Sequence, residues 1–183
     1  MAFNVNEIKA QLAFGGARPS LFQVQINNPA DGAGDLKTPF LVKASTIPES
    51  VMGLIEVPYF GRKIRIAGDR TFAPWSVTVI NDEDFLIRNS METWQNSINS
   101  LQGNLRTTGT SAPNAYKSDA LVSQFSKTGE LLRQYRFVGI FPTTIAPIPL
   151  SWEAVDTIEE FDVEFQYDYW EVIGGTTGNA GGI

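Results

Sequence analysis

Cysteine and histidine are both absent from this chain of 183 residues. Without cysteine there is no disulfide framework, no thiolate metal site and no thiol redox chemistry, a composition that favours a reducing compartment. Without histidine the chain lacks the commonest general base, the commonest neutral metal ligand and the usual partner of a Ser or Cys nucleophile. We therefore expect no catalytic residues, no cofactor-binding residues and no metal site.

An excess of positive charge and long hydrophobic runs are also missing. The chain has 14 Lys and Arg against 20 Asp and Glu, a net charge of −6, which opposes attraction to a nucleic-acid backbone. No run approaches the roughly 18 apolar residues of a membrane helix, and no basic segment followed by an apolar one opens the chain. A DNA-coating role, membrane insertion and export by a signal peptide are therefore not expected.

What the sequence does contain predicts a mainly β fold. Apolar and polar residues alternate with the period of a half-buried strand in several segments that are separated by Gly, Pro and Asn. The predicted strands are residues 21–26, 38–44, 53–59, 62–67, 74–80, 118–126, 131–141, 145–152 and 158–172. Residues 127–130 predict a hairpin turn, and Pro58 indicates an edge position for its strand.

Two helices are predicted beside these strands. Residues of about 82–101 carry one apolar stripe, with Asp82, Glu83 and Asp84 in the first turn to complement the helix dipole. A short helix over residues 4–14 ends at Gly15-Gly16. The expected fold is a β-barrel or sandwich of two packed antiparallel sheets, with one long flanking helix and a short N-terminal helix. We expect one domain over residues 1–173, a flexible Gly-rich tail over 174–183, and all four tryptophans in the core.

Three groups of residues are candidates for function. Asp162, Glu164 and Asp168 alternate with aromatic and aliphatic residues, and carboxylates spaced about 7 Å apart on a strand face could hydrolyse glycosides. A solvated strand face or a charged pore wall explains them better. The other two groups lie in residues 47–66: an apolar set predicting contact with a second subunit, and a basic set predicting ion pairs with a neighbour's carboxylates. Their members are Val51, Met52, Leu54 and Ile55, and Arg62, Lys63 and Arg65.

Longer stretches of the sequence resemble one protein family, the tail tube proteins of contractile-tailed bacteriophages, which are related to tailocin and type VI secretion inner tube proteins. The resemblance covers nearly the whole domain, and the run from Arg62 to Glu83 is its most specific part. The loops 28–38 and 104–115 and the Gly-rich tail are longer than in the family. The stretches that carry the resemblance are residues 17–24, 61–72, 75–83, 116–117 and 168–171.

The resemblance implies a structural virion protein. Six copies would form a ring, and rings would stack into an inner tail tube that delivers the genome into the host. The implied partners are further copies of the chain, the tail sheath protein, the baseplate hub and the tail terminator, while DNA passes through the lumen without specific binding. The tube would be assembled in the host bacterial cytoplasm. A tailocin or type VI-like tube, and a carbohydrate-active β-sandwich from a different class, remain as alternatives.

The resemblance also gives the candidate residues roles. If Asp162, Glu164 and Asp168 line the lumen, a ring of six copies with about −36 charges would keep DNA from adhering to the wall. The apolar segment 47–60 would join one ring to the next. Which strand face points inward does not follow from the sequence.

Overall fold

Antiparallel strands dominate the computed structural model, which describes residues 5–12 and 15–180. Its strands are β1 (Phe22–Ile26), β2 (Val42–Ser45), β3 (Ser50–Tyr59), β4 (Arg62–Phe72), β5 (Trp75–Ile80), β6 (Ser118–Phe125), β7 (Leu131–Ile145), β8 (Glu160–Gln166) and β9 (Tyr169–Gly174). Its helices are α1 (Val5–Gln11), α2 (Thr38–Leu41), α3 (Leu86–Ile98), α4 (Pro113–Tyr116) and the short 3-10 helix η1 (Gly32–Gly34). Among these described residues no helix is long and apolar enough to cross a membrane.

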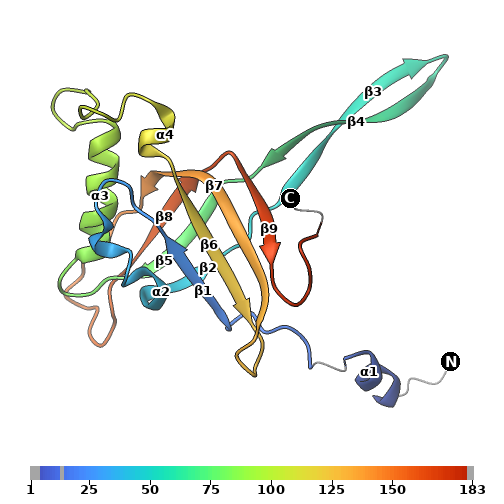
Figure 1. The fold of residues 1–183 in the computed structure, drawn as a ribbon, viewed down its shortest axis with the longest axis horizontal. Helices are drawn as coiled ribbons and strands as arrows, with labels where there is room; N and C mark the ends of the chain where they lie inside the picture. Colours follow the sequence, from blue (N-terminus) through green and yellow to red (C-terminus); the bar gives the residue numbers. More distant parts are fainter. Residues whose placement is uncertain (1–4, 13–14, 181–183) are drawn as a thin grey trace.

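Seven strands form one bent sheet in the order β1-β6-β7-β8-β5-β2, with β9 also paired to β7 (Figure 1). The long strand β7 pairs with β6 and β9 through its first part and with β8 from Phe141 onward. The two parts of the sheet thus face each other across the core. Edge strands β1 and β2 do not pair with each other, so the sheet is sandwich-like and not closed into a barrel. The expected mainly β fold with packed antiparallel sheets is confirmed.

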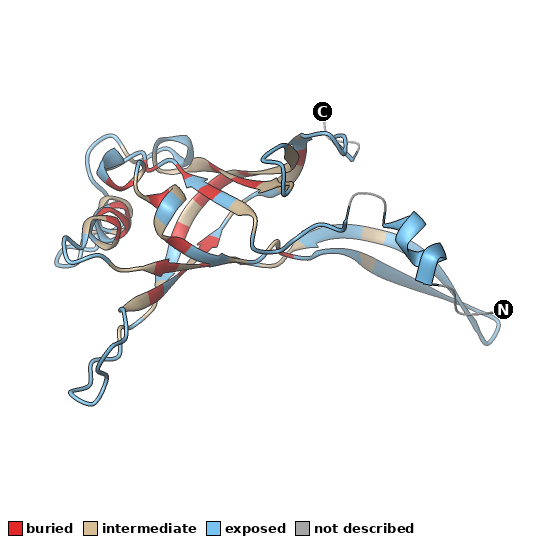
Figure 2. Cartoon of the chain, turned by 90° about the horizontal axis from the view of Figure 1, so that it is seen from below, coloured by how far each residue is buried: buried red, intermediate tan, exposed pale blue. Residues whose placement is uncertain are grey.

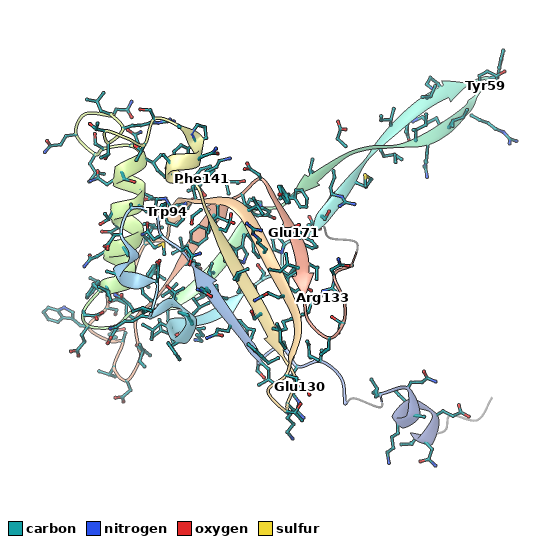
Figure 3. All side chains as sticks on the ribbon, in the orientation of Figure 1. Tyr59, Trp94, Glu130, Arg133, Phe141 and Glu171 are labelled. Carbon is teal, nitrogen blue, oxygen red and sulfur yellow. The ribbon has the colours of Figure 1, made fainter. Side chains whose placement is uncertain are left out.

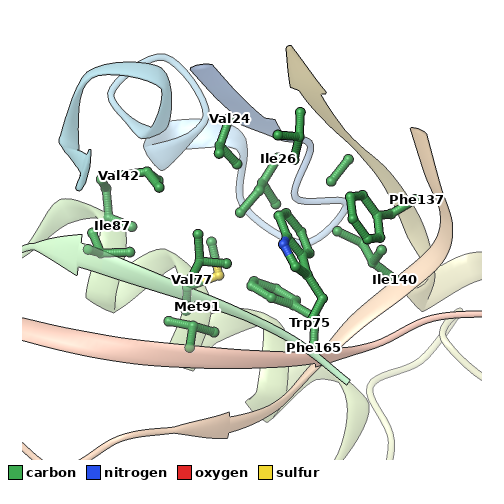
Figure 4. Close-up of a cluster of buried hydrophobic side chains, with 14 of the residues drawn as sticks. Val24, Ile26, Val42, Trp75, Val77, Ile87, Met91, Phe137, Ile140 and Phe165 are labelled. Carbon is green, nitrogen blue, oxygen red and sulfur yellow. The ribbon is translucent and has the colours of Figure 1, made fainter. Parts of the chain in front are cut away.

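The core lies between the two parts of the sheet (Figure 4). Trp75 stacks on Phe137 with ring centroids 4.4 Å apart, and Phe165 lies 5.3 Å from the same indole. From α3, Trp94 is fully buried and its Nε1 donates a hydrogen bond to the carbonyl oxygen of Tyr116 at 2.7 Å. Truncating such a buried aromatic side chain to Ala typically costs about 3–5 kcal/mol. Helix α3 therefore closes one end of the sandwich.

Helix α3 is shorter than predicted, because the acidic residues before it have other partners. Asp82 and Asp84 both form ion pairs with Lys37, and the Asp84 carboxylate also accepts the Leu86 backbone N–H at 3.1 Å. The Lys37 ammonium lowers the pKa of Asp84. Phe85 has a left-handed backbone, with φ of 51°, which separates this segment from the helix. The prediction that acidic residues occupy the first turn was wrong.

Three predicted strands also differ in the structure. Residues 38–41 of the segment 38–44 form α2, with a proline in its first turn, where proline fits a helix. Residues 146–152 are not a strand, and β7 instead continues to Ile145. The predicted strand 158–172 is two strands, β8 and β9, because the chain turns between them and the Asp168 N–H donates to the Val138 carbonyl oxygen at 2.9 Å.

The remaining differences lie in helices, tryptophans and the C-terminal segment. Of the predicted helix 4–14, residues 5–11 form α1, while residues 4, 13 and 14 lie outside the described residues. Trp152 is fully exposed, so the prediction that it lies in the core was wrong. After β9, the N–H groups of Thr176 and Thr177 donate to the carbonyl oxygens of Leu131 and Leu132 at 3.1 and 3.2 Å. The division into a domain of 1–173 and a tail of 174–183 stays a prediction.

Candidate assembly surface

Strands β3 and β4 form a two-stranded arm, residues 50–72, that projects away from the body (Figures 1 and 2). All of its residues are exposed except the half-buried Gly53, Gly68 and Phe72. Phe60 and Gly61 at the tip have φ of 44° and 80°, the left-handed conformations that a two-residue hairpin turn with the favoured twist requires. Tyr59 marks this tip, far from the core, in Figure 3.

The strand register gives the arm two different faces. Residues directly opposite each other share a face, and successive residues of a strand alternate between faces. Ile55 lies opposite Ile66, and Val57 lies opposite Ile64; Val51 lies on the same side of β3 by alternation. We call this set, Val51, Ile55, Val57, Ile64 and Ile66, the apolar face. The other side, the charged face, carries Met52, Leu54, Glu56, Lys63 and Arg65.

Contacts within the charged face satisfy only part of its charge. Glu56 accepts from Lys63 Nζ at 2.5 Å and lies 3.6 Å from Arg65 Nε. Lys63 and Arg65 are largely exposed while Glu56 is about one third exposed, and ion pairs near the surface stabilise a fold by about 0–1 kcal/mol. These ion pairs therefore position side chains on the arm more than they stabilise it.

Among the residues that the structure describes, none covers the apolar face completely. Its five side chains are between 42% and 53% exposed. Covering a Val or Ile side chain completely gains about 1.5–3 kcal/mol relative to full exposure, so a partner that covers the exposed halves would gain several kcal/mol in all. A two-stranded ribbon alone is at best marginally stable in water. An exposed, contiguous apolar surface on such a ribbon is typical of a protein–protein contact.

All seven residues predicted for a subunit interface lie on the arm. Val51 and Ile55 belong to the apolar face, while Met52, Leu54, Lys63 and Arg65 lie on the charged face. Arg62 lies opposite Tyr59 at the tip. The sequence reasoning missed Val57, Ile64 and Ile66, although pairing the two predicted strands across the Phe60-Gly61 turn would have found them. Their role in an interface stays a prediction.

The three acidic residues predicted for a lumen are not brought together. Asp162 and Glu164 point away from the core on β8, where the Asp162 carboxylate accepts from the Thr78 hydroxyl at 2.6 Å. Asp168 lies in the turn to β9 and forms an ion pair with Lys117 at 2.6 Å. Strand β8 ends at Gln166, so the period of two does not continue to Asp168. Among the described residues, no group of three or more acidic side chains is arranged to hold a metal ion.

Comparison with known proteins identifies the family. The family model described as phage tail tube protein matches residues 10–173. The tail tube protein gp19 of Enterobacteria phage T4 is 38% identical over 156 residues, which cover 85% of this chain and 91% of that protein. The tail tube protein of Serratia phage KSP90 is 27% identical over 168 residues, which cover 89% and 93% of the two chains.

Solved structures share the fold. The tube-terminating cap of the anti-feeding prophage superimposes with a TM-score of 0.64 at 15% identity, covering 87% of this chain and 92% of that one. A chain of the sheath–tube complex of an extracellular contractile injection system gives a TM-score of 0.58 at 15% identity, covering 94% and 99%. The chain belongs to the phage tail tube protein family, whose members are structural components of the virion and not enzymes.

Proposed function

We propose that copies of this chain form hexameric rings that stack helically into the inner tail tube of a contractile-tailed phage, and that the genome passes through the lumen into the host. The uncovered apolar face of the arm is the observation that supports self-assembly most directly, because five exposed aliphatic side chains on a thin ribbon need a partner surface. A repeating tube supplies one such surface for every copy.

The tail sheath protein, the baseplate hub and the tail terminator are the proposed partners. The similar solved chains come from a sheath–tube complex, a tube-terminating cap and a baseplate, which supports this set of contacts. Assembly would take place in the host bacterial cytoplasm. The net charge of −6 supports passage of DNA without specific binding, because the wall and the phosphates carry charge of the same sign.

We propose that Asp162 and Glu164 line the lumen wall, and that Asp168, in the turn after β8, faces the lumen with them. The outward side of β8 carries both carboxylates, and the adjacent outward residue Glu160 is paired with Lys43 at 2.6 Å. Repeated around a ring of six copies, this face would present a belt of negative charge to the DNA.

The test of assembly through the arm is a pair of substitutions on its apolar face, Ile55→Asp together with Ile66→Asp. Both side chains are about half exposed in the free chain, so the thermal unfolding of the monomer should change little. Tube formation should be lost at concentrations where the wild-type chain assembles, because two carboxylates would have to be buried unpaired. Electron microscopy and sedimentation measure the outcome.

A matched control is Leu101→Asp together with Leu105→Asp, which changes two exposed leucines after α3 by the same chemistry. We expect this variant to assemble as the wild type does. Normal tubes from the arm variant, at wild-type yield, would contradict a role of the arm in assembly.

A second candidate is the inner tube of a tailocin or a type VI-like injection system. The TM-score of 0.58 with a tube of an extracellular contractile injection system supports it, since the same fold serves both kinds of tube. The 38% identity to the phage T4 protein favours the phage tail. The genes beside this one would separate the two, because a phage also encodes capsid and DNA-packaging proteins.

A further inference from the structure

The direction of the arm relative to the body is important for any regular assembly. A contact between two copies repeats into a ring or a helical filament only if every copy offers it in the same geometry. The arm extends from one end of the molecule, and a second exposed apolar surface, the β7–β8 loop of residues 146–159, lies at the other end (Figure 1). Four side chains of this loop are each at least 70% exposed: Leu150, Trp152, Val155 and Ile158.

The base of the arm is held by the body. The ring of Phe72 lies 6.0 Å from the ring of Tyr167 and 6.2 Å from the ring of Trp170, measured between centroids. Beyond this base, and within the described residues, β3 and β4 pair with each other and with no other strand. The direction of the outer arm therefore depends on the shape of the ribbon itself.

The pairing of β3 with β4 is interrupted at one point between the base and the tip. The register shifts by one residue between Met52 and Leu54. Gly53 thus faces two residues of β4, Gly68 and Asp69, which is the arrangement of a β-bulge. A bulge bends its strand and increases the local right-handed twist.

Glycine on both strands allows a close approach at this bulge. A Cβ built on Gly53 would lie 2.9 Å from the backbone oxygen of Asp69, closer than Cβ atoms normally come to any atom. A Cβ on Gly68 would lie 3.2 Å from the Gly53 carbonyl carbon and 3.3 Å from Ile55 Cγ1. Neither glycine has a left-handed backbone. Both positions therefore require glycine for space and not for backbone conformation.

The extra residue in β4 also keeps a cation off the apolar face. In a regular ladder continued from Ile66, Arg70 would lie opposite Val51, on the apolar face. The bulge places it opposite Met52 instead, on the side of the charged face. The apolar face therefore continues across the bulge from Ile55 to Val51 without an arginine on it.

The shape of the arm agrees with this local geometry. Figure 1 shows its two strands crossing in projection between the base and the tip, and Figure 2 shows the arm curving along its length. Strong twist is typical of a two-stranded ribbon, and a bulge adds a bend at one defined point.

We propose that the bulge of Gly53, Gly68 and Asp69 sets the direction of the outer arm, and that the two glycines are positioning residues for assembly. The aromatic contacts hold the base, the outer part carries most of the apolar face, and the bulge sets the angle between them. The role in assembly rests on the proposed function, whereas the angle is a property of the free chain.

Two variants change the bulge in different ways. Deletion of Gly68 removes the extra residue of β4 while every other cross-strand pair can remain, so no side chain moves to the other face. Gly53→Ala keeps the extra residue but forces the strands apart, because its Cβ would meet the backbone of Asp69. The buried core contains no residue of the arm, so the thermal unfolding of the body should change little in either variant.

Spin-label distances in the free monomer measure the direction of the arm. The cysteine-free chain allows a label on the body at Gln25→Cys, combined with Arg62→Cys at the tip or Ser50→Cys at the base, all at exposed positions. Residues 54–59 form a lever about 20 Å long, so a change in direction of about 15° moves the tip by about 5 Å. Both variants should shift the body-to-tip distance by about this amount and leave the body-to-base distance unchanged.

Tube formation is the second readout. Both variants should need at least about tenfold more protein to assemble, because an arm that points elsewhere buries less of its apolar face at each contact. A matched control is Gly103→Ala, which adds the same methyl group after α3, where the nearest atom to the new Cβ is a side-chain carbon of Leu105 at 3.4 Å. This variant should keep both spin-label distances and assemble as the wild type does.

The two readouts separate this role from the proposed function. Shifted tip distances together with impaired assembly support the role of the bulge. Unchanged tip distances in both variants would show that the bulge does not set the direction of the arm, and shifted distances with normal tubes would show that assembly does not depend on it; in both cases the tube function stands. If the wild-type chain never forms tubes, the proposed function fails and the role in assembly falls with it, while the monomer distances still decide whether the bulge directs the arm.

Discussion

At the scale of single residues, Tyr167 links the end of β8 to the residue after the arm. Its hydroxyl donates a hydrogen bond to the Ala73 carbonyl oxygen at 2.6 Å, and its ring packs edge-on against Phe137 with centroids 5.2 Å apart. Burial raises the pKa of this phenol from about 10 to about 12. Tyr167 thus helps to hold the base of the arm against the core.

This pKa shift gives a pH dependence with a definite sign. The folded state favours the neutral phenol, so the stabilisation is fully present below about pH 10 and is lost as the pH rises toward 12. Tyr167→Phe should lower the free energy of unfolding by about 1 kcal/mol at neutral pH, through loss of the hydrogen bond. The variant should also lose less stability than the wild type as the pH rises, and thermal unfolding between pH 8 and 12 would measure this difference. Parallel curves for the two proteins would contradict this account.

At the scale of elements, the bend in β7 depends on Gly139. This residue is unpaired between Val138 and Ile140, and it has φ of +71°, a conformation that L side chains rarely adopt. A Cβ placed here would lie 2.3 Å from Asp168 Oδ2. The bulge is where β7 passes from its pairing with β6 and β9 to its pairing with β8.

Gly139→Ala should therefore destabilise the fold by about 1–3 kcal/mol from backbone strain, with a further loss as Asp168 moves away from Lys117. A matched control is Gly129→Ala, because Gly129 also has positive φ, +85°, but nothing lies near its missing Cβ. We expect the smaller loss there. Chemical denaturation of the two variants measures the difference, and equal losses would show that crowding against Asp168 has no effect.

The sequence predicted those elements whose pattern depends on burial alone. Strands β5 and β8 alternate strictly, and the stripe of Ile87, Met91 and Trp94 predicted the face of α3 that is buried. The errors came from contacts across the chain. The local sequence predicted that Asp82 and Asp84 begin a helix. In the structure they form ion pairs with Lys37, which is 45 and 47 residues away in the sequence, and a local pattern cannot show such a contact.

The same limit applied to the candidate site. The apolar and basic residues of the segment 47–66 predicted a subunit interface, and all seven residues predicted for it lie on the arm. Their division into an apolar and a charged face needed the register of β3 on β4, which the sequence alone did not supply. The alternation from Asp162 to Asp168 was misleading for a related reason, because the turn after Gln166 depends on pairing with β7.

At the scale of the whole molecule, the arm and the β7–β8 loop extend from a compact sandwich in opposite directions (Figure 1). A free monomer exposes both, so it leaves a large apolar area in water that a repeating assembly would cover. Net charge would have a separate role in the proposed tube, since six acidic copies would surround the path of the DNA.

The proposed lumen wall can be tested by neutralisation. Asp162→Asn, Glu164→Gln and Asp168→Asn together remove three charges per copy while keeping the side chains close to their original size. We expect slower DNA ejection or a lower yield of infectious virions, because DNA would adhere more readily to a less negative wall. A control variant with Glu7→Gln, Glu83→Gln and Glu130→Gln removes three exposed carboxylates on other elements. If the first variant ejects DNA as fast as the control and gives the same yield, these residues do not act on the DNA.

Self-assembly of this chain into a tube can be tested directly by negative-stain electron microscopy of the purified protein across a concentration series, with sedimentation of the same samples. We expect hollow tubes, or rings with six-fold end views, that increase with concentration at the expense of monomer. A chain that stays monomeric across the series, and is missing from the tubes formed when the tail genes of its own genome are co-expressed, would contradict this expectation.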